Sequence, residues 1–248
     1  MQPAKEAIIT PSRAFYAEYK ARVVTHLLEE NAADRLQDDI DQLQRPTGVR
    51  PAVLYRLMAP NRNTAVVHPI CIGNALSEPG HYLIRYHPEG RVRWIFFPIL
   101  IKARRLWPAE IAGDEGHWIL VAVDLVERKL LCLDSGRHQH KRKLWPELEG
   151  EVKSALGPIY EELYVAHGAT PPSTWRSTNF TYPDPSTFPP QKDSYNCAVY
   201  CALYAAQLTM GQSLKDMYIK KEDLVQWRKN AATQLQTLIG PETFLPDV

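Results

Sequence analysis

The sequence predicts a single α+β domain in which helices flank a central mixed or antiparallel sheet. Residues 1–60 carry apolar side chains at helical spacing, whereas residues 64–134 contain short runs rich in β-branched and aromatic residues. Helical patterns return from residue 145, and one of them, over residues 197–208, is apolar on almost every side. Such a helix belongs in a core. Helices before and after a sheet-forming middle are typical of an α+β domain.

The first 60 residues are expected to form a helical N-terminal portion of this domain. Three segments have apolar residues at helical spacing, and these are Ser12–Glu30, Ala33–Leu43 and Ala52–Met58. Pro46 and Pro51 separate the second segment from the third. No convincing domain boundary follows, so we expect residues 61–248 to complete the same domain.

Five segments in the middle of the chain are predicted strands. They are residues 64–72, 81–86, 91–100, 117–125 and 129–134. The fourth is apolar on both faces, so it should lie at the centre of the sheet. Two further helices are predicted over residues 145–167 and 222–238, and the proline-rich stretch 168–190 is predicted to be a long loop.

Composition and charge are those of a soluble globular protein. Hydrophobic residues make up 45% and charged residues 23% of the chain, and the formal net charge of +1 gives no field that would attract nucleic acid or a membrane. Four cysteines in 248 residues indicate reduced thiols and no disulfide scaffold. No segment has the pattern of a signal peptide or a membrane span. We therefore expect a monomer that acts in the cytoplasm or nucleus, either of its own cell or of a host cell into which it is delivered.

One cysteine lies where the apolar helix is predicted to begin. The polar segment Gln191–Asn196 leads directly into Cys197. Asn196 is a good N-cap residue, which places Cys197 in the first helical turn. There the free N–H groups and the positive end of the helix dipole favour thiolate over thiol. Cys197 is therefore a candidate nucleophile, and the alternative is a buried structural cysteine.

A predicted hairpin brings a histidine and an aspartate together. His117 opens the first strand of the hairpin and Asp134 closes the second. In an antiparallel pair, the start of one strand lies beside the finish of the other. A carboxylate beside an imidazole can fix its tautomer and stabilise the imidazolium. The alternative is a solvated histidine at a strand end and an aspartate that opens the turn at Asp134–Gly136.

A glutamine six residues before Cys197 completes a set of catalytic residue types. A nucleophilic cysteine needs a base, a group that orients the base, and donors for an oxyanion. Gln191 can supply a side-chain N–H, and Cys197 can supply its backbone N–H. Cys197 and Cys201 lie one helical turn apart, but no further residues at metal-ligand spacing accompany them, so a shared metal is not expected.

In this order and spacing, the residues resemble the cysteine proteases specific for SUMO and other ubiquitin-like proteins, within the adenain-like clan. The matching features are His117-Trp118 opening a strand, Asp134-Ser135 closing the next, Gln191 with Cys197 entering a core helix, and the apolar strand Phe96–Ile99 before the His-Trp pair. The resemblance covers about residues 92–238 and is weak at the N-terminus.

Three positions next to the proposed site depart from the family's usual pattern. The family usually has Asp before the nucleophile and Gly after it, where this chain has Asn196 and Ala198. Asn keeps the capping ability without the charge, and Ala adds a methyl group where backbone and substrate pass closely. Arg35 takes the place of an aromatic residue that walls the tunnel over a Gly-Gly tail, and Trp118 remains as one wall. Trp118, Asn196 and Arg35 are therefore the residues expected to affect substrate binding.

The resemblance implies a thiol protease or isopeptidase that cleaves after the C-terminal glycine of ubiquitin or a ubiquitin-like modifier such as SUMO or NEDD8. It implies that Cys197 attacks the carbonyl, His117 transfers the proton, Asp134 orients His117, and Gln191 stabilises the oxyanion. It also implies that no metal or organic cofactor is needed. Two alternatives stay open. One is an acetyltransferase of the same clan that uses acetyl-coenzyme A, and the other is a catalytically weak binder of ubiquitin-like proteins. The basic run Arg137–Lys143 and the 168–190 loop are candidate surfaces for partner recognition.

Overall fold

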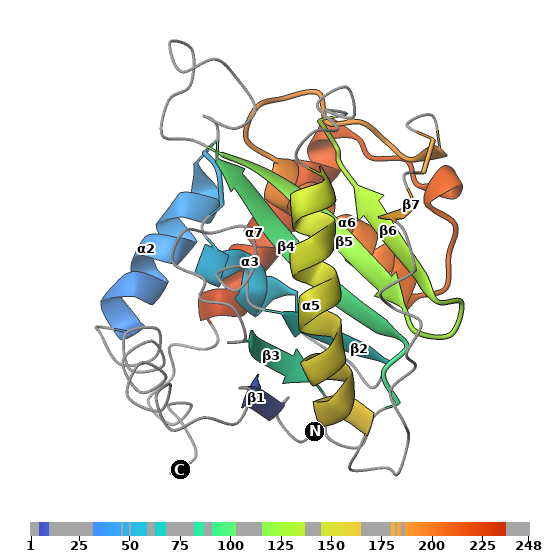
Figure 1. Ribbon diagram of the computed structural model, residues 1–248. Helices are drawn as coiled ribbons and strands as arrows, with labels where there is room; N and C mark the ends of the chain where they lie inside the picture. Colours follow the sequence, from blue (N-terminus) through green and yellow to red (C-terminus); the bar gives the residue numbers. More distant parts are fainter. Residues whose placement is uncertain are drawn as a thin grey trace.

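Figure 1 shows the computed structural model of the chain. It describes residues 5–9, 32–45, 47–49, 51–58, 63–67, 82–86, 91–102, 116–136, 145–164, 180–181, 183–184 and 187–236. The predicted helix Ser12–Glu30 and the basic run Arg137–Lys143 lie outside these residues. Among the helices in the described ranges, none is both long and apolar enough to cross a membrane.

A mixed sheet of seven strands forms the centre of the fold. The strands are β1 (Lys5–Ile9), β2 (Thr64–Val67), β3 (Tyr82–Tyr86), β4 (Trp94–Lys102), β5 (Gly116–Asp124), β6 (Lys129–Leu133) and β7 (Phe180–Thr181). Their order across the sheet is β1-β3-β2-β4-β5-β6-β7. The pairs β2–β4 and β6–β7 are parallel and the others are antiparallel. The expected α+β fold with a mixed central sheet is confirmed.

Two strands were missing from the sequence prediction. β1 lies in the N-terminal portion that was expected to be helical, and it pairs along its whole length with β3. β7 lies in the proline-rich stretch that was expected to be a loop, and it pairs with β6. Runs of five and two residues are too short to show a period, so pairing with a neighbouring strand decides their structure.

The central strands separate two layers of apolar side chains. β4 and β5 pair from Trp94 opposite Asp124 to Lys102 opposite Gly116. Phe96, Trp118 and Leu120 lie in one buried cluster, whereas side chains that alternate with them, such as Phe97 and Ile119, lie in the other. The expectation that residues 117–125 form a strand buried on both faces is confirmed.

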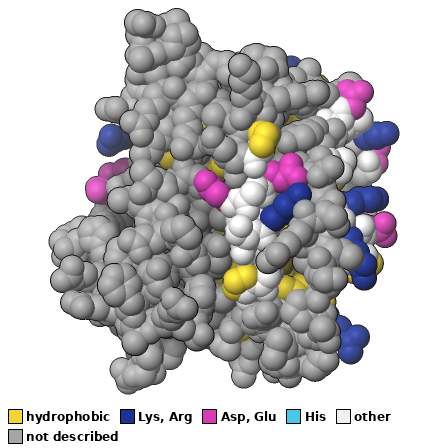
Figure 2. Space-filling model, in the orientation of Figure 1, with side chains coloured by type: hydrophobic (Ala, Val, Ile, Leu, Met, Phe, Trp, Pro, Cys, Tyr) yellow, Lys and Arg dark blue, Asp and Glu magenta, His cyan; other side chains and the backbone are white. Residues whose placement is uncertain are grey.

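Helices cover both faces of the sheet (Figure 1). Helix α5 (Trp145–Tyr164) packs on the cluster that contains Phe97 and Ile119. The opposite face is covered by α6 (Cys197–Thr209), with α2 (Ala32–Gln44), α3 (Pro51–Leu57), the short turn η7 (Leu214–Asp216) and α7 (Lys221–Gln236) around it. On the face drawn in Figure 2, which contains α5, acidic and basic side chains of the described residues are interspersed.

Candidate active site

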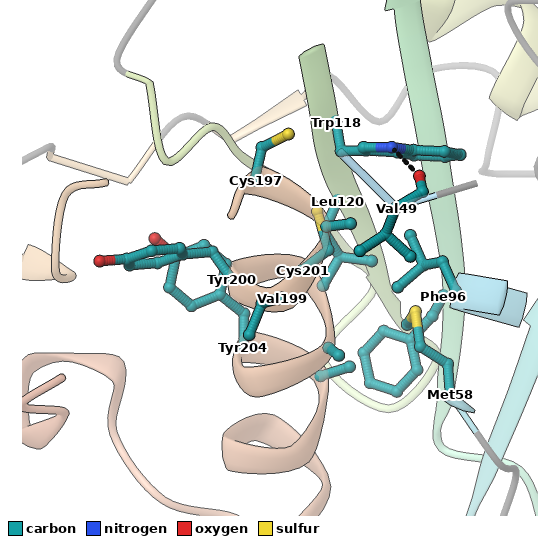
Figure 3. Packing of buried hydrophobic residues seen from close by; sticks show 14 of the residues in the cluster. Val49, Met58, Phe96, Trp118, Leu120, Cys197, Val199, Tyr200, Cys201 and Tyr204 are labelled. Carbon is teal, nitrogen blue, oxygen red and sulfur yellow. Dashed lines mark hydrogen bonds between the residues drawn. The ribbon is translucent and has the colours of Figure 1, made fainter. Parts of the chain in front are cut away.

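Helix α6 is the buried helix that the sequence predicted, and its first residue is Cys197. Cys197 is 3% exposed, and all but four of the helix's 13 residues are buried. Val199 and Cys201 belong to the same apolar cluster as Trp118 of β5 (Figure 3). The apolar character of α6 on all sides therefore places the thiol at the edge of the core, against the sheet.

The hairpin of β5 and β6 brings His117 and Asp134 into contact. The last ladder pair is Leu120 opposite Leu133, so Asp134 immediately follows the paired part of β6. His117 Nε2 donates a hydrogen bond to Asp134 Oδ1 over 2.7 Å, and both side chains are buried. Asp134 Oδ1 also accepts a hydrogen bond from the backbone N–H of Gly136. The carboxylate thus both closes the turn and holds the imidazole, and the alternative of a solvated histidine is wrong.

The imidazole of His117 also forms a hydrogen bond with Cys197. Because Nε2 faces Asp134, the nitrogen left for the thiol is Nδ1. Burial by itself lowers the pKa of His117, but the hydrogen bonds and charges of Asp134 and Cys197 raise the pKa to about 9. His117 is therefore protonated at neutral pH and lies between a carboxylate and a sulfur atom.

The other described cysteines have a different electrostatic environment. Burial raises the pKa of the Cys132 and Cys201 thiols well above the ordinary value, so both are neutral. Among the described cysteines, Cys197 has the hydrogen bond to an imidazole. Cys132 and Cys201 are packing residues of the two clusters.

Gln191 is tied to both sides of the site. Its backbone N–H donates to Ser135 O, and its Oε1 accepts from Ser135 Oγ, each over 2.9 Å. Its Nε2 donates to Asp193 O over 2.7 Å and contacts Asp193 Oδ1 at 3.3 Å. The amide is therefore fixed beside the residue that follows Asp134, on the segment that leads to Cys197.

Asn196 occupies the N-cap position of α6, but the expected side-chain cap is not formed. Its Oδ1 accepts a hydrogen bond from Arg228 Nε over 2.7 Å, and its Nδ2 donates to Asp193 Oδ2 over 2.9 Å. Asp193 Oδ1 accepts the backbone N–H groups of Tyr195 and Asn196. The predicted N-cap position is confirmed, whereas the side-chain cap is absent because a buried arginine takes the amide oxygen.

Trp118 and Arg35 lie on two different elements, β5 and α2. The Trp118 indole is 2% exposed, and its Nε1 donates a hydrogen bond to Val49 O over 2.9 Å (Figure 3). Arg35 lies on α2, and its side chain is outside the described part of the chain. The tunnel role of these two residues stays a prediction.

Arg228, a buried arginine on α7, was not among the residues predicted for the site. Its guanidinium contacts Asn196, Tyr195, Arg45 and Thr47, and the residue is 6% exposed. Arg228 lies four residues after Leu224 and three before Ala231, which are both buried. A charged residue on the apolar face of a predicted helix was the signal that could have revealed it.

No cluster of three or more His, Cys, Asp or Glu side chains that could hold a metal ion is found within the described ranges. The donors at the site are instead arranged around one thiol. A base bonded to it, a carboxylate bonded to the base, and an amide on the preceding segment are the groups that thiol-based acyl transfer uses.

Comparison with known proteins gives the class and the family. A family model described as "Ulp1 protease family, C-terminal catalytic domain" matches residues 91–242, which is more than half of the chain. The protein is therefore a cysteine-type peptidase. It belongs to the Ulp1 protease family, and the family resemblance found in the sequence is confirmed. Among curated protein sequences, none matches the chain significantly.

Solved structures of a SUMO protease share the fold. The protease Ulp1 with its catalytic cysteine oxidised to a sulfinic acid is 14% identical with a TM-score of 0.57, covering 93% of this chain and 98% of that chain. The C-terminal Ulp1 protease domain in complex with Smt3, the yeast orthologue of SUMO, is 14% identical with a TM-score of 0.54, covering 92% and 97%. At such identities the similarity shows the fold.

Proposed function

We propose that this protein is a thiol protease or isopeptidase that cleaves after the C-terminal glycine of a ubiquitin-like modifier, with SUMO as the first candidate. The observation that carries the proposal is the chain of contacts from Asp134 through His117 to Cys197 at the start of a buried helix, in a chain of the Ulp1 family. A protein of the same fold has been solved with Smt3, which favours SUMO over ubiquitin and NEDD8.

In the proposed reaction His117 takes the proton of the Cys197 thiol. The Cys197 sulfur attacks the carbonyl carbon of the C-terminal glycine, and the carbonyl oxygen becomes an oxyanion. His117 then gives its proton to the leaving amine, and a thioester remains on Cys197. His117 next takes a proton from water, which attacks the thioester and releases the modifier's carboxylate. Asp134 stabilises the imidazolium whenever His117 carries the proton and orients the neutral ring in between.

Gln191 and the backbone of Cys197 are the proposed oxyanion donors. The contact from Gln191 Nε2 to Asp193 Oδ1 is 3.3 Å, at the long end for an N–H···O hydrogen bond. An oxyanion at the site can compete for that N–H while the shorter bond to Asp193 O continues to hold the amide. The hydrogen bond from Ser135 Oγ keeps the carbonyl of the amide turned away from the oxyanion.

The proposed substrate-binding residues act in different ways. Asn196 is 3% exposed, so we assign it to holding the segment before Cys197 rather than to touching the modifier. Trp118 supports one wall of the proposed tunnel from within the core, and Arg35 is proposed for the other wall. Ala198 lies in the first turn of α6 and is fully buried, so we assign its methyl group to the core rather than to contact with the modifier tail. We propose that the protein acts as a monomer in the cytoplasm or nucleus, of its own cell or of a host cell.

The test is covalent labelling with electrophile probes built on the C-termini of SUMO, ubiquitin and NEDD8. We expect an adduct with the SUMO probe that is absent in Cys197→Ala. The matched control is Cys201→Ala, which removes a buried thiol one turn further along α6 and should still label. Adduct mass by intact-protein mass spectrometry is the readout.

Silence from all three probes with folded protein would contradict the proposal. Incubation of the same protein with acetyl-coenzyme A and a test substrate would then measure acetyl transfer. A calorimetric titration with unmodified SUMO would measure binding without turnover.

A further inference from the structure

Arg228 makes four hydrogen bonds to oxygen atoms of two separate segments. On the segment before α6 it reaches Asn196 Oδ1 over 2.7 Å and Tyr195 O over 3.1 Å. On the segment after α2 it reaches Arg45 O over 3.0 Å and Thr47 O over 2.8 Å. The guanidinium also lies 5.3 Å from the centre of the Tyr195 ring. One buried side chain therefore joins three parts of the chain.

On one side these bonds lead to the nucleophile. Tyr195 and Asn196 immediately precede Cys197, so a donor to both fixes the backbone from which α6 begins. The amide nitrogen of Asn196 donates a hydrogen bond to Asp193, and Asp193 accepts another from Gln191. Arg228 is thus linked to both proposed oxyanion donors, without contact to either.

On the other side the bonds lead to the base. Thr47 lies two residues before Val49, whose carbonyl oxygen accepts the hydrogen bond from the Trp118 indole. Trp118 is the neighbour of His117 on β5. The segment that Arg228 holds is therefore the same segment that braces the strand carrying the imidazole.

Side-chain packing alone does not hold these two segments in position, because a cavity of about 480 Å³ lies beside the place where they meet. Its lining includes Leu43, Arg45, Tyr195, Asn196, Leu224 and Arg228. Atoms that border a cavity lack contacts on that side, so directional hydrogen bonds must define their position.

Arg228 brings a positive charge to this junction as well as hydrogen bonds. The four acceptors are neutral oxygen atoms, so no carboxylate in this set cancels the guanidinium. Burial lowers the pKa of Arg228, and the charges of Tyr195, Asp193 and Cys197 oppose that shift. An arginine stays protonated at every working pH, so the junction holds a positive charge close to Cys197.

We propose that Arg228 is a positioning residue that sets the register between Cys197 and His117 by joining the segment before α6 to the segment that braces Trp118. This inference rests on the proposed thiol chemistry. It does not depend on which modifier is cleaved.

The experiment measures the rate at which iodoacetamide alkylates Cys197 between pH 5 and 10, in folded protein, by intact-protein mass spectrometry. Cys197→Ala gives the background from other cysteines. We expect Arg228→Met to lower the rate at pH 7 about ten-fold and to change the pH profile, because the Cys197 sulfur loses its fixed position beside the imidazole. Arg228→Lys should recover part of the rate, because an ammonium keeps the charge but cannot reproduce the planar fork. Asn196→Ala should lie between Arg228→Lys and wild type.

The matched control is Arg93→Met, which removes an arginine that bridges to Asp124 at the far end of β5. Its alkylation profile should coincide with that of wild type. A merely structural role for Arg228 would lower the melting temperature and leave the profile of the folded fraction unchanged, and that result would overturn the inference. If Arg228→Met does not fold, wild-type profiles for both Arg228→Lys and Asn196→Ala would overturn it equally. Failure of the modifier probes, with an alkylation profile that still depends on Arg228, would count against the proposed function and support this inference.

Discussion

The two ends of strand β5 carry similar cation–carboxylate pairs with different surroundings. At its start, His117 bonds to Asp134 over 2.7 Å, with side chains 8% and 2% exposed. At its end, Arg93 bonds to Asp124 over 2.8 Å, with side chains 46% and 4% exposed. Both aspartates also accept backbone N–H groups of the turn that follows, from Gly136 at Asp134 and from Val126 and Glu127 at Asp124.

Both ends of β5 have a buried aspartate, and the cation bonded to that aspartate decides whether the pair can transfer a proton. Burial would raise the pKa of Asp124, but hydrogen bonds from Arg93, Glu127 and Val126 hold it below its usual value. The guanidinium of Arg93 stays charged at every working pH, so that pair can only hold the strand end. His117 can give up its proton, and Cys197 lies on its other side. The same local motif is structural at one end and suited to proton transfer at the other.

The largest expected effect is on the start of β5. His117→Gln should lower the rate of modifier cleavage at least about 1,000-fold, because the thiol loses its base. Steady-state hydrolysis of a SUMO C-terminal fluorogenic conjugate measures this. A residual rate within ten-fold of wild type would show that another group takes the proton.

A smaller loss is expected when the carboxylates are exchanged for amides. Asp134→Asn should lower kcat about 100-fold, because the imidazolium loses its partner and burial then lowers the pKa of His117. Asp124→Asn is the matched substitution at the other end of the strand and should leave kcat unchanged while lowering the stability. Equal losses of kcat in the two variants would mean that the two ends of β5 do not differ in function.

The pH dependence of stability should also separate the two ends. The pKa of His117 is raised from 6.5 to about 9, so its contribution is fully present below pH 6.5 and is lost as the pH rises through 9. The free energy of unfolding in urea should therefore fall from pH 7 to pH 10 more steeply in wild type than in His117→Gln. Parallel curves for the two proteins would contradict the raised pKa.

The smallest effect is expected for Arg93→Met. Its half-exposed ion pair should contribute less than about 1 kcal/mol to the free energy of unfolding, and cleavage should be unaffected. Urea titration beside the SUMO conjugate assay measures both quantities. A loss of cleavage with retained stability would show that the end of β5 communicates with the site.

The parts of the site that could be predicted were those with local patterns. The hairpin pattern predicted the contact of His117 with Asp134, because a tight turn places the start of the first strand beside the end of the second. The unbroken apolar pattern of α6 forecast its burial and the position of Cys197. Both predictions use fewer than 20 consecutive residues, because hydrophobic periodicity and turn residues are local signals.

The parts that could not be predicted depend on distant partners. Asn196 occupies the predicted N-cap position, but its side chain forms no cap because Arg228, 32 positions away, takes its oxygen. β1 forms because β3 lies beside it, which no pattern within its own five residues indicates. A single sequence shows what each residue can do, whereas the partner that it selects depends on the packed fold.

The paired hydrogen bonds between Ser135 and Gln191 have a consequence for how this protein can change in evolution. They join two residues 56 positions apart in the sequence, so the chain between Ser135 and Gln191 forms a closed loop that begins and ends at the site. Lengthening a closed loop is cheap, at about 0.6 kcal/mol for each doubling of its length. Insertions between Gly136 and α5, or between α5 and Thr187, can therefore accumulate while Asp134 and Gln191 keep their spacing. This tie gives the protein a stretch in which new recognition surfaces can arise without disturbing the chemistry.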